Sequence, residues 1–191
     1  MKELSLNILD IAENSVKAGA TLSEIGITEK DGLLTLRIAD DGCGMTEEIL
    51  KTVTDPFYTT RTTRKVGMGI PLLKLEAELT GGGVEIVSKY ISSYPEEHGT
   101  VVTATFYKNH IDCTPLGDVV ASITTLIQGH PDTDFLFIHK TEDREVSLDT
   151  RELREVLGDV SLAEFEVIQW IKEYLNEQYS HDISQSIGKD E

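Results

Sequence analysis

The spacing of hydrophobic residues changes several times along the first 110 positions, and each change predicts an element. Apolar residues first recur every three or four positions, which predicts a helix that begins near Leu4 and ends before Gly19. Residues 22–28 and 33–39 then alternate apolar with polar side chains, and Asp31-Gly32 between them favours a hairpin turn. The other elements predicted here are helices at 46–52 and 71–79 and strands at 84–90 and 100–107.

This order of elements predicts an α+β fold, with helices on one face of a mixed, mostly antiparallel sheet. After Lys108 the pattern restarts, which indicates a domain over residues 1–108 and an α+β extension over residues 109–191. The extension is predicted to contain helices near 116–128, 150–157 and 161–178 and strands near 134–139 and 144–148. Such an extension either completes the first fold or docks on a partner.

A second stripe on the first helix is entirely polar. Its members are Glu3, Asn7, Asp10, Asn14 and Lys17. A polar stripe is usually a solvated helix face. Asp10 and Asn14 are also one turn apart, so their side chains are neighbours. An amide oxygen is a suitable Mg²⁺ ligand, and a carboxylate beside it could orient or deprotonate a water. Both interpretations stay open on the sequence alone.

Two glycine-containing segments suggest a nucleotide pocket. Asp40 follows an apolar strand and precedes Gly42 and Gly44, so a carboxylate could accept a hydrogen bond from a base amine where the backbone comes close. Gly67-Met68-Gly69 opens a helix after a predicted mobile loop at 56–66, and helix starts bind anions. The loop supplies cations at Arg61, Arg64 and Lys65. A plain acidic turn and a bare helix entry are the respective alternatives.

Composition narrows the classes of partner. The 191 residues carry a net charge of -17, which makes nucleic acid and anionic membrane surfaces unlikely partners. Residues 1–110 contribute -5 (11 Lys/Arg, 16 Asp/Glu) and residues 111–191 contribute -12 (6 Lys/Arg, 18 Asp/Glu). No apolar run reaches the roughly 20 residues that span a bilayer, and no secretory segment is present, so we expect a cytoplasmic protein. Cys43 and Cys113 are expected to be reduced thiols.

Residues 8–106 resemble the ATPase superfamily that unites DNA gyrase, the heat-shock chaperones, sensor histidine kinases and the mismatch-repair MutL proteins. Five motifs carry the resemblance: Ala12-Glu13-Asn14-Ser15 through Ala18-Gly19-Ala20-Thr21, Asp40-Asp41-Gly42-Cys43-Gly44, Asp55-Pro56-Phe57-Tyr58-Thr59-Thr60-Arg61, Gly67-Met68-Gly69-Ile70, and Gly99-Thr100. The resemblance implies a Bergerat fold, a two-layer α/β sandwich, with ATP or ADP and Mg²⁺ as cofactors.

The resemblance also implies roles for individual residues. Asn14 would hold the metal, Asp40 would contact adenine, and Asp10 stands where the family's hydrolases place a catalytic Glu. The further residues expected to bind the nucleotide are Lys17, Gly42, Gly44, Met45, Phe57, Arg61, Arg64, Lys65, Gly67, Met68, Gly69, Ile70 and Thr100.

Three departures from the family pattern shape the functional expectation. Asp10 is one methylene shorter than Glu, and Lys65 replaces a glycine of the second glycine box. Only thirteen positions precede Asn14, so we expect no phosphoacceptor-histidine module before it. The lid then resembles those of kinases and anti-sigma factors. We expect a protein kinase or nucleotide switch acting on an unidentified partner protein or phosphoacceptor. A MutL-like ATPase with Asp10 as the base, and a non-catalytic module that responds to ATP or ADP, are the alternatives.

Overall fold

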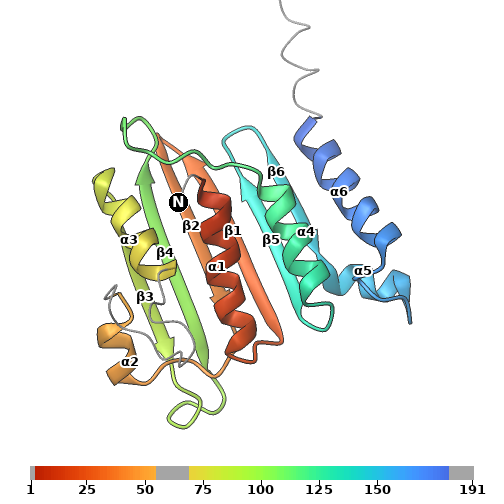
Figure 1. The fold of residues 1–191 in the computed structure, drawn as a ribbon, viewed down its shortest axis with the longest axis horizontal. Coiled ribbons are helices and arrows are strands. Elements are labelled where there is room, and N and C mark those ends of the chain that lie inside the picture. Colours follow the sequence, from red (N-terminus) through yellow and green to blue (C-terminus); the bar gives the residue numbers. More distant parts are fainter. Residues whose placement is uncertain (1–2, 55–68, 181–191) are drawn as a thin grey trace, which may run out of the picture.

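The computed structural model describes residues 3–54 and 69–180, which form one six-stranded sheet with helices packed against it (Figure 1). In chain order the elements are α1 (Leu4–Lys17), β1 (Leu22–Lys30), β2 (Leu33–Asp40), α2 (Glu47–Thr52), α3 (Gly69–Leu79), β3 (Gly83–Lys89), β4 (Gly99–Tyr107), α4 (Val119–Gly129), β5 (Asp134–Lys140), β6 (Glu145–Asp149), α5 (Thr150–Leu157) and α6 (Phe165–Ser180). These elements follow the hydrophobic periods closely.

The sheet has the strand order β3-β4-β2-β1-β5-β6. Every neighbouring pair is antiparallel except β1 and β5, which run parallel. Figure 1 shows α3, α1 and α4 side by side on one face of the sheet, with α6 at the β6 end. The predicted α+β class, with helices on one face of a mixed and mostly antiparallel sheet, is confirmed.

The predicted hairpin joins β1 to β2 through a tight two-residue turn. Asp31 and Gly32 both have positive φ, 52° and 77°, as a type I′ turn requires. The turn sets the register in which Lys30 pairs with Leu33 and Ser23 pairs with Asp40. Asp40 therefore lies at the far end of the hairpin, opposite the turn.

The segment beyond residue 108 joins the same sheet. β5 lies beside β1 over its whole length, from Leu22 opposite Asp134 to Thr28 opposite Lys140. Phe135 and Phe137 of β5 belong to the same hydrophobic core as Ile25 and Ile27 of β1. The two parts thus share one core, and the division of the chain at residue 108 stays a prediction.

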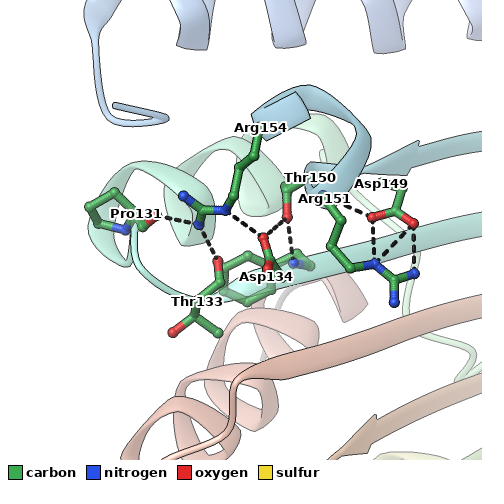
Figure 2. A network of polar contacts seen from close by, with 8 residues as sticks. Pro131, Thr133, Asp134, Asp149, Thr150, Arg151 and Arg154 are labelled. Atoms are coloured by element: carbon green, nitrogen blue, oxygen red, sulfur yellow. Dashed lines mark hydrogen bonds and ion pairs between the residues drawn. The ribbon is translucent and has the colours of Figure 1, made fainter. Parts of the chain in front are cut away.

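A polar network ties α5 to the start of β5 (Figure 2). Arg154 donates to the Asp134 carboxylate at 2.7 Å and to the carbonyl oxygens of Pro131 and Thr133. Thr150, fully buried, donates to Asp134 and accepts from the Phe135 amide. Since these groups satisfy one another in a region of low exposure, the network fixes the direction in which the chain leaves β6.

The predicted loop at 56–66 lies outside the described residues. No helix in the described ranges is long and apolar enough to cross a membrane.

Candidate functional site

The carboxylate of Asp40 accepts hydrogen bonds from three different elements at the end of β2. Its Oδ2 accepts from the hydroxyl of Ser15 on α1 at 2.7 Å. Its Oδ1 accepts from the amide of Gly42 at 3.0 Å and from the amide of Thr100 on β4 at 3.2 Å. Helix, strand and loop therefore fix the orientation of one half-buried acid.

A second set of contacts extends from Thr100 to the loop after β2. The Ser88 hydroxyl of β3 lies 2.9 Å from the Thr100 hydroxyl, donates to the Gly99 carbonyl, and accepts from the Met45 amide at 2.7 Å. Asp40, Thr100 and Met45 were each predicted from the sequence to bind a nucleotide, and this network brings them together.

The glycines of this loop are explained by close approaches within the chain. A Cβ on Gly44, whose φ is +68°, would lie 2.0 Å from the carbonyl oxygen of Lys89. A Cβ on Gly42 would lie 2.8 Å from the Cβ of Ala18. Side chains at these positions would push the loop away from α1 and β3. The close approach of Gly42 and Gly44 to an adenine ring stays a prediction.

Asp41, beside Asp40, has a different task. Its carboxylate accepts from the amides of Thr21 and Leu22, at 2.7 and 2.9 Å, and from the Thr21 hydroxyl. Burial would raise the pKa of Asp41, but these hydrogen bonds outweigh it and lower the pKa. Asp41 therefore anchors the loop to the start of β1.

The polar stripe of α1 divides into a buried and an open part. Asn7 is fully buried and donates to Glu76 of α3, itself nearly buried. Asp10 is exposed, and the start of α3 passes beside it, since a Cβ on Gly69 would lie 3.6 Å from Asp10 Oδ2. Asn14 is half-buried one turn further along. The structure thus places the predicted metal ligand and the predicted base on the part of α1 that ends beside Asp40.

α1 is held at both ends by the chain beyond residue 110. The Leu4 and Ser5 amides donate to the carbonyls of Pro115 and Leu116, at 2.9 and 2.8 Å. Glu13 accepts from Lys17 and lies 2.7 Å from Nε2 of His130, which follows α4. The hydrogen bond with His130 is the largest influence that lowers the pKa of Glu13. The residue next to Asn14 is therefore linked directly to the extension.

The remaining predicted site residues divide into two groups. Gly69 and Ile70 begin α3, where Ile70 is buried. Phe57, Arg61, Arg64, Lys65, Gly67 and Met68 lie outside the described residues. Within residues 3–54 and 69–180, no group of three or more His, Cys, Asp or Glu side chains could hold a metal by itself.

Sequence reasoning missed three contributors to this site. Ser15 lies on the buried face of α1. A hydroxyl group on an otherwise apolar helix face was the signal that could have indicated its role. Ser88 lies in a strand whose apolar and polar residues alternate as in any half-buried strand, so nothing in the sequence distinguished it. His98, whose Nδ1 lies 2.7 Å from the Gly42 carbonyl oxygen, lies in the polar loop before β4 and had no local signal. Each of these three residues contributes through a hydrogen bond to a residue that is distant in sequence.

Comparison with known families and proteins gives matches in sequence and in fold. Residues 2–110 match the family described as histidine kinase-, DNA gyrase B-, and HSP90-like ATPase. The sensor protein KdpD of Clostridium acetobutylicum is 33% identical over 94 residues, which are 47% of this chain and 10% of KdpD. The chain therefore matches only about a tenth of that relative's length.

Two solved structures share the fold. The N-terminal domain of a DNA repair protein has a TM-score of 0.57 and 16% identity, over 78% of this chain and 53% of its own. The ATPase domain of Aquifex aeolicus MutL, complexed with ADP, has a TM-score of 0.54 and 17% identity, over 82% of this chain and 69% of its own. At such identities the likeness concerns the fold alone.

Proposed function

The chain belongs to the family of histidine kinase-, DNA gyrase B- and HSP90-like ATPases, and from that premise we propose that it is a magnesium-dependent, ATP-binding regulatory protein that acts on a partner protein. Asp40 would bind the adenine, Asn14 would hold the metal, and the partner would either receive the γ-phosphoryl group or sense the bound nucleotide.

The observation that carries this proposal is the set of donors around Asp40. A carboxylate offers about four acceptor positions on its two oxygens. Ser15, Gly42 and Thr100 occupy three of them. One position is left for a donor such as the exocyclic amine of adenine, and the three existing bonds would keep the carboxylate aimed at it without reorganisation. The residues present therefore fit a purine with an amine.

The described residues also fit a metal that arrives with its nucleotide. Mg²⁺ usually keeps several waters and is bound by one or two protein groups together with phosphate oxygens. Asn14 on α1 supplies such a group, and the described part of the chain has no carboxylate or histidine cluster that would bind a metal alone. ATP supplies the transferable phosphoryl group, while the chain positions it and neutralises charge, which is most of what phosphoryl transfer requires.

Calorimetry with ATP, ADP and a non-hydrolysable ATP analogue, each with and without Mg²⁺, tests the binding step. We expect ATP to bind, and chelation of Mg²⁺ by EDTA to weaken binding, because the triphosphate charge would then be neutralised less. Binding of none of the three nucleotides would refute the proposal.

Transfer is tested separately from binding. The full chain is incubated with ATP labelled at the γ-phosphate and a cell extract, and labelled proteins are identified by mass spectrometry. Label on a partner protein supports a kinase. If no protein is labelled but ATP and ADP bind with different affinities, the chain is a nucleotide switch without transfer.

A second candidate is ATP hydrolysis with Asp10 as the general base. The exposed position of Asp10 beside the first residue of α3 favours it, because a water there would be within reach of a nucleotide held by Asn14. Turnover that is lost in Asp10→Asn while ATP affinity is retained would support this candidate. Glu78→Gln, on the exposed part of α3, is the matched control and should keep any turnover. Turnover at the level of a protein-free blank would exclude hydrolysis.

A further inference from the structure

The outward flank of α6 carries an exposed aromatic pair. Trp170 and Tyr174, one turn apart, stack with ring centroids 5.0 Å apart and an interplanar angle of 11°. They remain 48% and 38% exposed. Ile171 and Leu175, each one position after a ring residue, are fully buried in the core. Large aromatic side chains left at a surface are typical of protein–protein contacts.

Carboxylates surround this pair on the same helix. Glu166 lies one turn before Trp170, and Glu173 and Glu177 lie between and after the rings at three- and four-residue spacing. All three are exposed, and within the described ranges none of them forms an ion pair. We call Glu166, Trp170, Glu173, Tyr174 and Glu177 the α6 stripe. It combines aromatic faces with unneutralised negative charge.

A shallow hollow of about 540 Å³ continues the stripe at the start of α6. It is lined by Asp159, Val160, Ser161, Glu164, Phe165, Glu166 and Val167. Phe165 is 70% exposed, and Glu166 belongs to both the hollow and the α6 stripe. The hollow has the same composition as the stripe, apolar side chains among acids.

At the outer edge of the sheet, the middle residue of β6 is hydrogen-bonded to α6. The side-chain amide of Gln178 accepts from the Ser147 amide and donates to the Ser147 carbonyl, both at 3.0 Å. The backbone groups of Ser147 are therefore not available to a further strand at the middle of β6. An occupant beside this point would contact side chains of α6.

We propose that the α6 stripe and its adjoining hollow bind a basic amphipathic helix of a partner protein. Arginine and lysine side chains would stack on Trp170 and Tyr174 and pair with the glutamates. Apolar side chains at helical spacing would enter the hollow, as in other helix-in-groove complexes. A second copy of this chain fits poorly, because residues 111–191 carry 18 acidic and 6 basic residues, a net -12, and two such surfaces would repel.

This surface would give the proposed regulatory protein its route to a partner. It lies on the element that packs against α4, whose end meets α1 through the contact between His130 and Glu13. The proposal depends on the proposed function only for its biological meaning. Its test uses no nucleotide. A chain that does not bind ATP can therefore still bind the helix, and a chain that does not bind the helix can still bind ATP.

Trp170 is the single tryptophan of the chain, so its fluorescence reports on the stripe directly. The full chain is titrated with a synthetic amphipathic helix of Leu, Arg and Lys, and with the same peptide carrying Glu in place of Arg and Lys. We expect saturable binding of the basic peptide with a change in Trp170 emission, and none with the acidic peptide. Unchanged Trp170 emission at saturation of the basic peptide would overturn the proposal.

Matched variants separate the stripe from general attraction to an acidic protein. The triple variant Glu166→Gln/Glu173→Gln/Glu177→Gln should lose about tenfold or more in affinity, as hot-spot residues do. The triple variant Glu85→Gln/Glu96→Gln/Asp132→Asn removes the same charge from exposed positions elsewhere and should bind as the parent chain does. Tyr174→Ser should weaken binding, whereas Tyr94→Ser should not. Equal losses in both triple variants would contradict the proposal, as would self-association through the stripe in sedimentation.

Discussion

At the scale of single residues, the adjacent carboxylates of Asp40 and Asp41 at the end of β2 have different hydrogen-bond partners. Asp41 is committed to the loop by hydrogen bonds from Thr21 and Leu22. Asp40 is held by Ser15, Gly42 and Thr100 with one acceptor position to spare. Asp40 differs from its neighbour because its partners come from α1, the loop and β4, whereas those of Asp41 come from the start of β1.

Ser15→Ala tests whether the orientation of Asp40 matters for binding. Loss of the 2.7 Å hydrogen bond should weaken ATP binding by about 1 kcal/mol, roughly fivefold, because the carboxylate would no longer be fixed on its Oδ2 side. Calorimetry with ATP and Mg²⁺ measures the change. Ser180→Ala, which removes a hydroxyl hydrogen bond at the end of α6, is the control and should leave the affinity as it is. Equal affinities for Ser15→Ala and the parent chain would contradict this role.

His139 makes the stability of the molecule depend on pH. It is buried between Glu29 of β1, at 3.0 Å from Nε2, and Tyr179 of α6, at 2.8 Å from Nδ1. Burial raises the pKa of Tyr179 to about 12, so the phenol stays protonated and donates to Nδ1, while Nε2–H donates to Glu29. Burial also lowers the pKa of His139, against the raising effect of Glu29, and Arg144 and Lys108 lower it further.

A histidine whose pKa is lowered by folding resists protonation in the folded state. Its contribution to stability is complete above the unfolded pKa of about 6.5 and is lost as the pH falls below that value toward the folded pKa. Melting temperatures measured between pH 8 and pH 5 should fall more for the parent chain than for His139→Gln. His110→Gln, at an exposed position, should keep the parent profile. Parallel profiles for His139→Gln and the parent chain would contradict the assignment.

At the scale of elements, hydrophobic periodicity predicts what each segment becomes but not which segment it meets. Alternation over residues 134–139 predicts a strand, yet nothing in that segment indicates that β5 runs parallel to β1. The polar stripe of α1 likewise suggests a solvated face, whereas Asn7 is buried against Glu76 of α3. Partners 69 residues apart in sequence leave no local pattern, so the site could be predicted only as separate motifs.

Arg154 and Arg151 form a matched pair for testing the attachment of α5. Arg154 joins Asp134, Pro131 and Thr133 across 20 or more residues of sequence, whereas Arg151 pairs with Asp149, two residues away (Figure 2). Arg154→Leu should cost about 2 kcal/mol of unfolding free energy, because a part-buried carboxylate and carbonyls lose their donor. Arg151→Leu should cost about 0.5 kcal/mol or less, as exposed ion pairs do. Urea unfolding measures both, and equal costs would contradict the network.

At the scale of the whole molecule, α1 lies between α3, which follows the predicted lid, and α4, which belongs to the extension (Figure 1). Its contacts reach Glu76 on one side and Pro115, Leu116 and His130 on the other. The helix that carries Asp10 and Asn14 is therefore packed between both halves of the chain. A structural change in either half would shift this helix and so the side chains of Asp10 and Asn14.

Removal of residues 111–191 tests whether the family segment folds by itself. The shortened chain would lose β5 from the side of β1 and α4 from the side of α1, which would expose core residues such as Ile25 and Ile27. We expect an unfolded or aggregated fragment by circular dichroism and sedimentation, with the full chain as the control. A monomeric fragment that melts cooperatively would show instead that residues 1–110 form an independent domain.

The central claim is that Asp40 recognises a purine nucleotide in this structure. Calorimetry of ATP with Mg²⁺ on the parent chain, on Asp40→Asn and on the exposed control Asp132→Asn tests it most directly, with circular dichroism to confirm that each variant is folded. We predict that Asp40→Asn weakens binding by about tenfold or more, the cost of losing a hydrogen bond to a charged group, while Asp132→Asn binds as the parent chain does. A folded Asp40→Asn variant with unchanged ATP affinity would contradict the account.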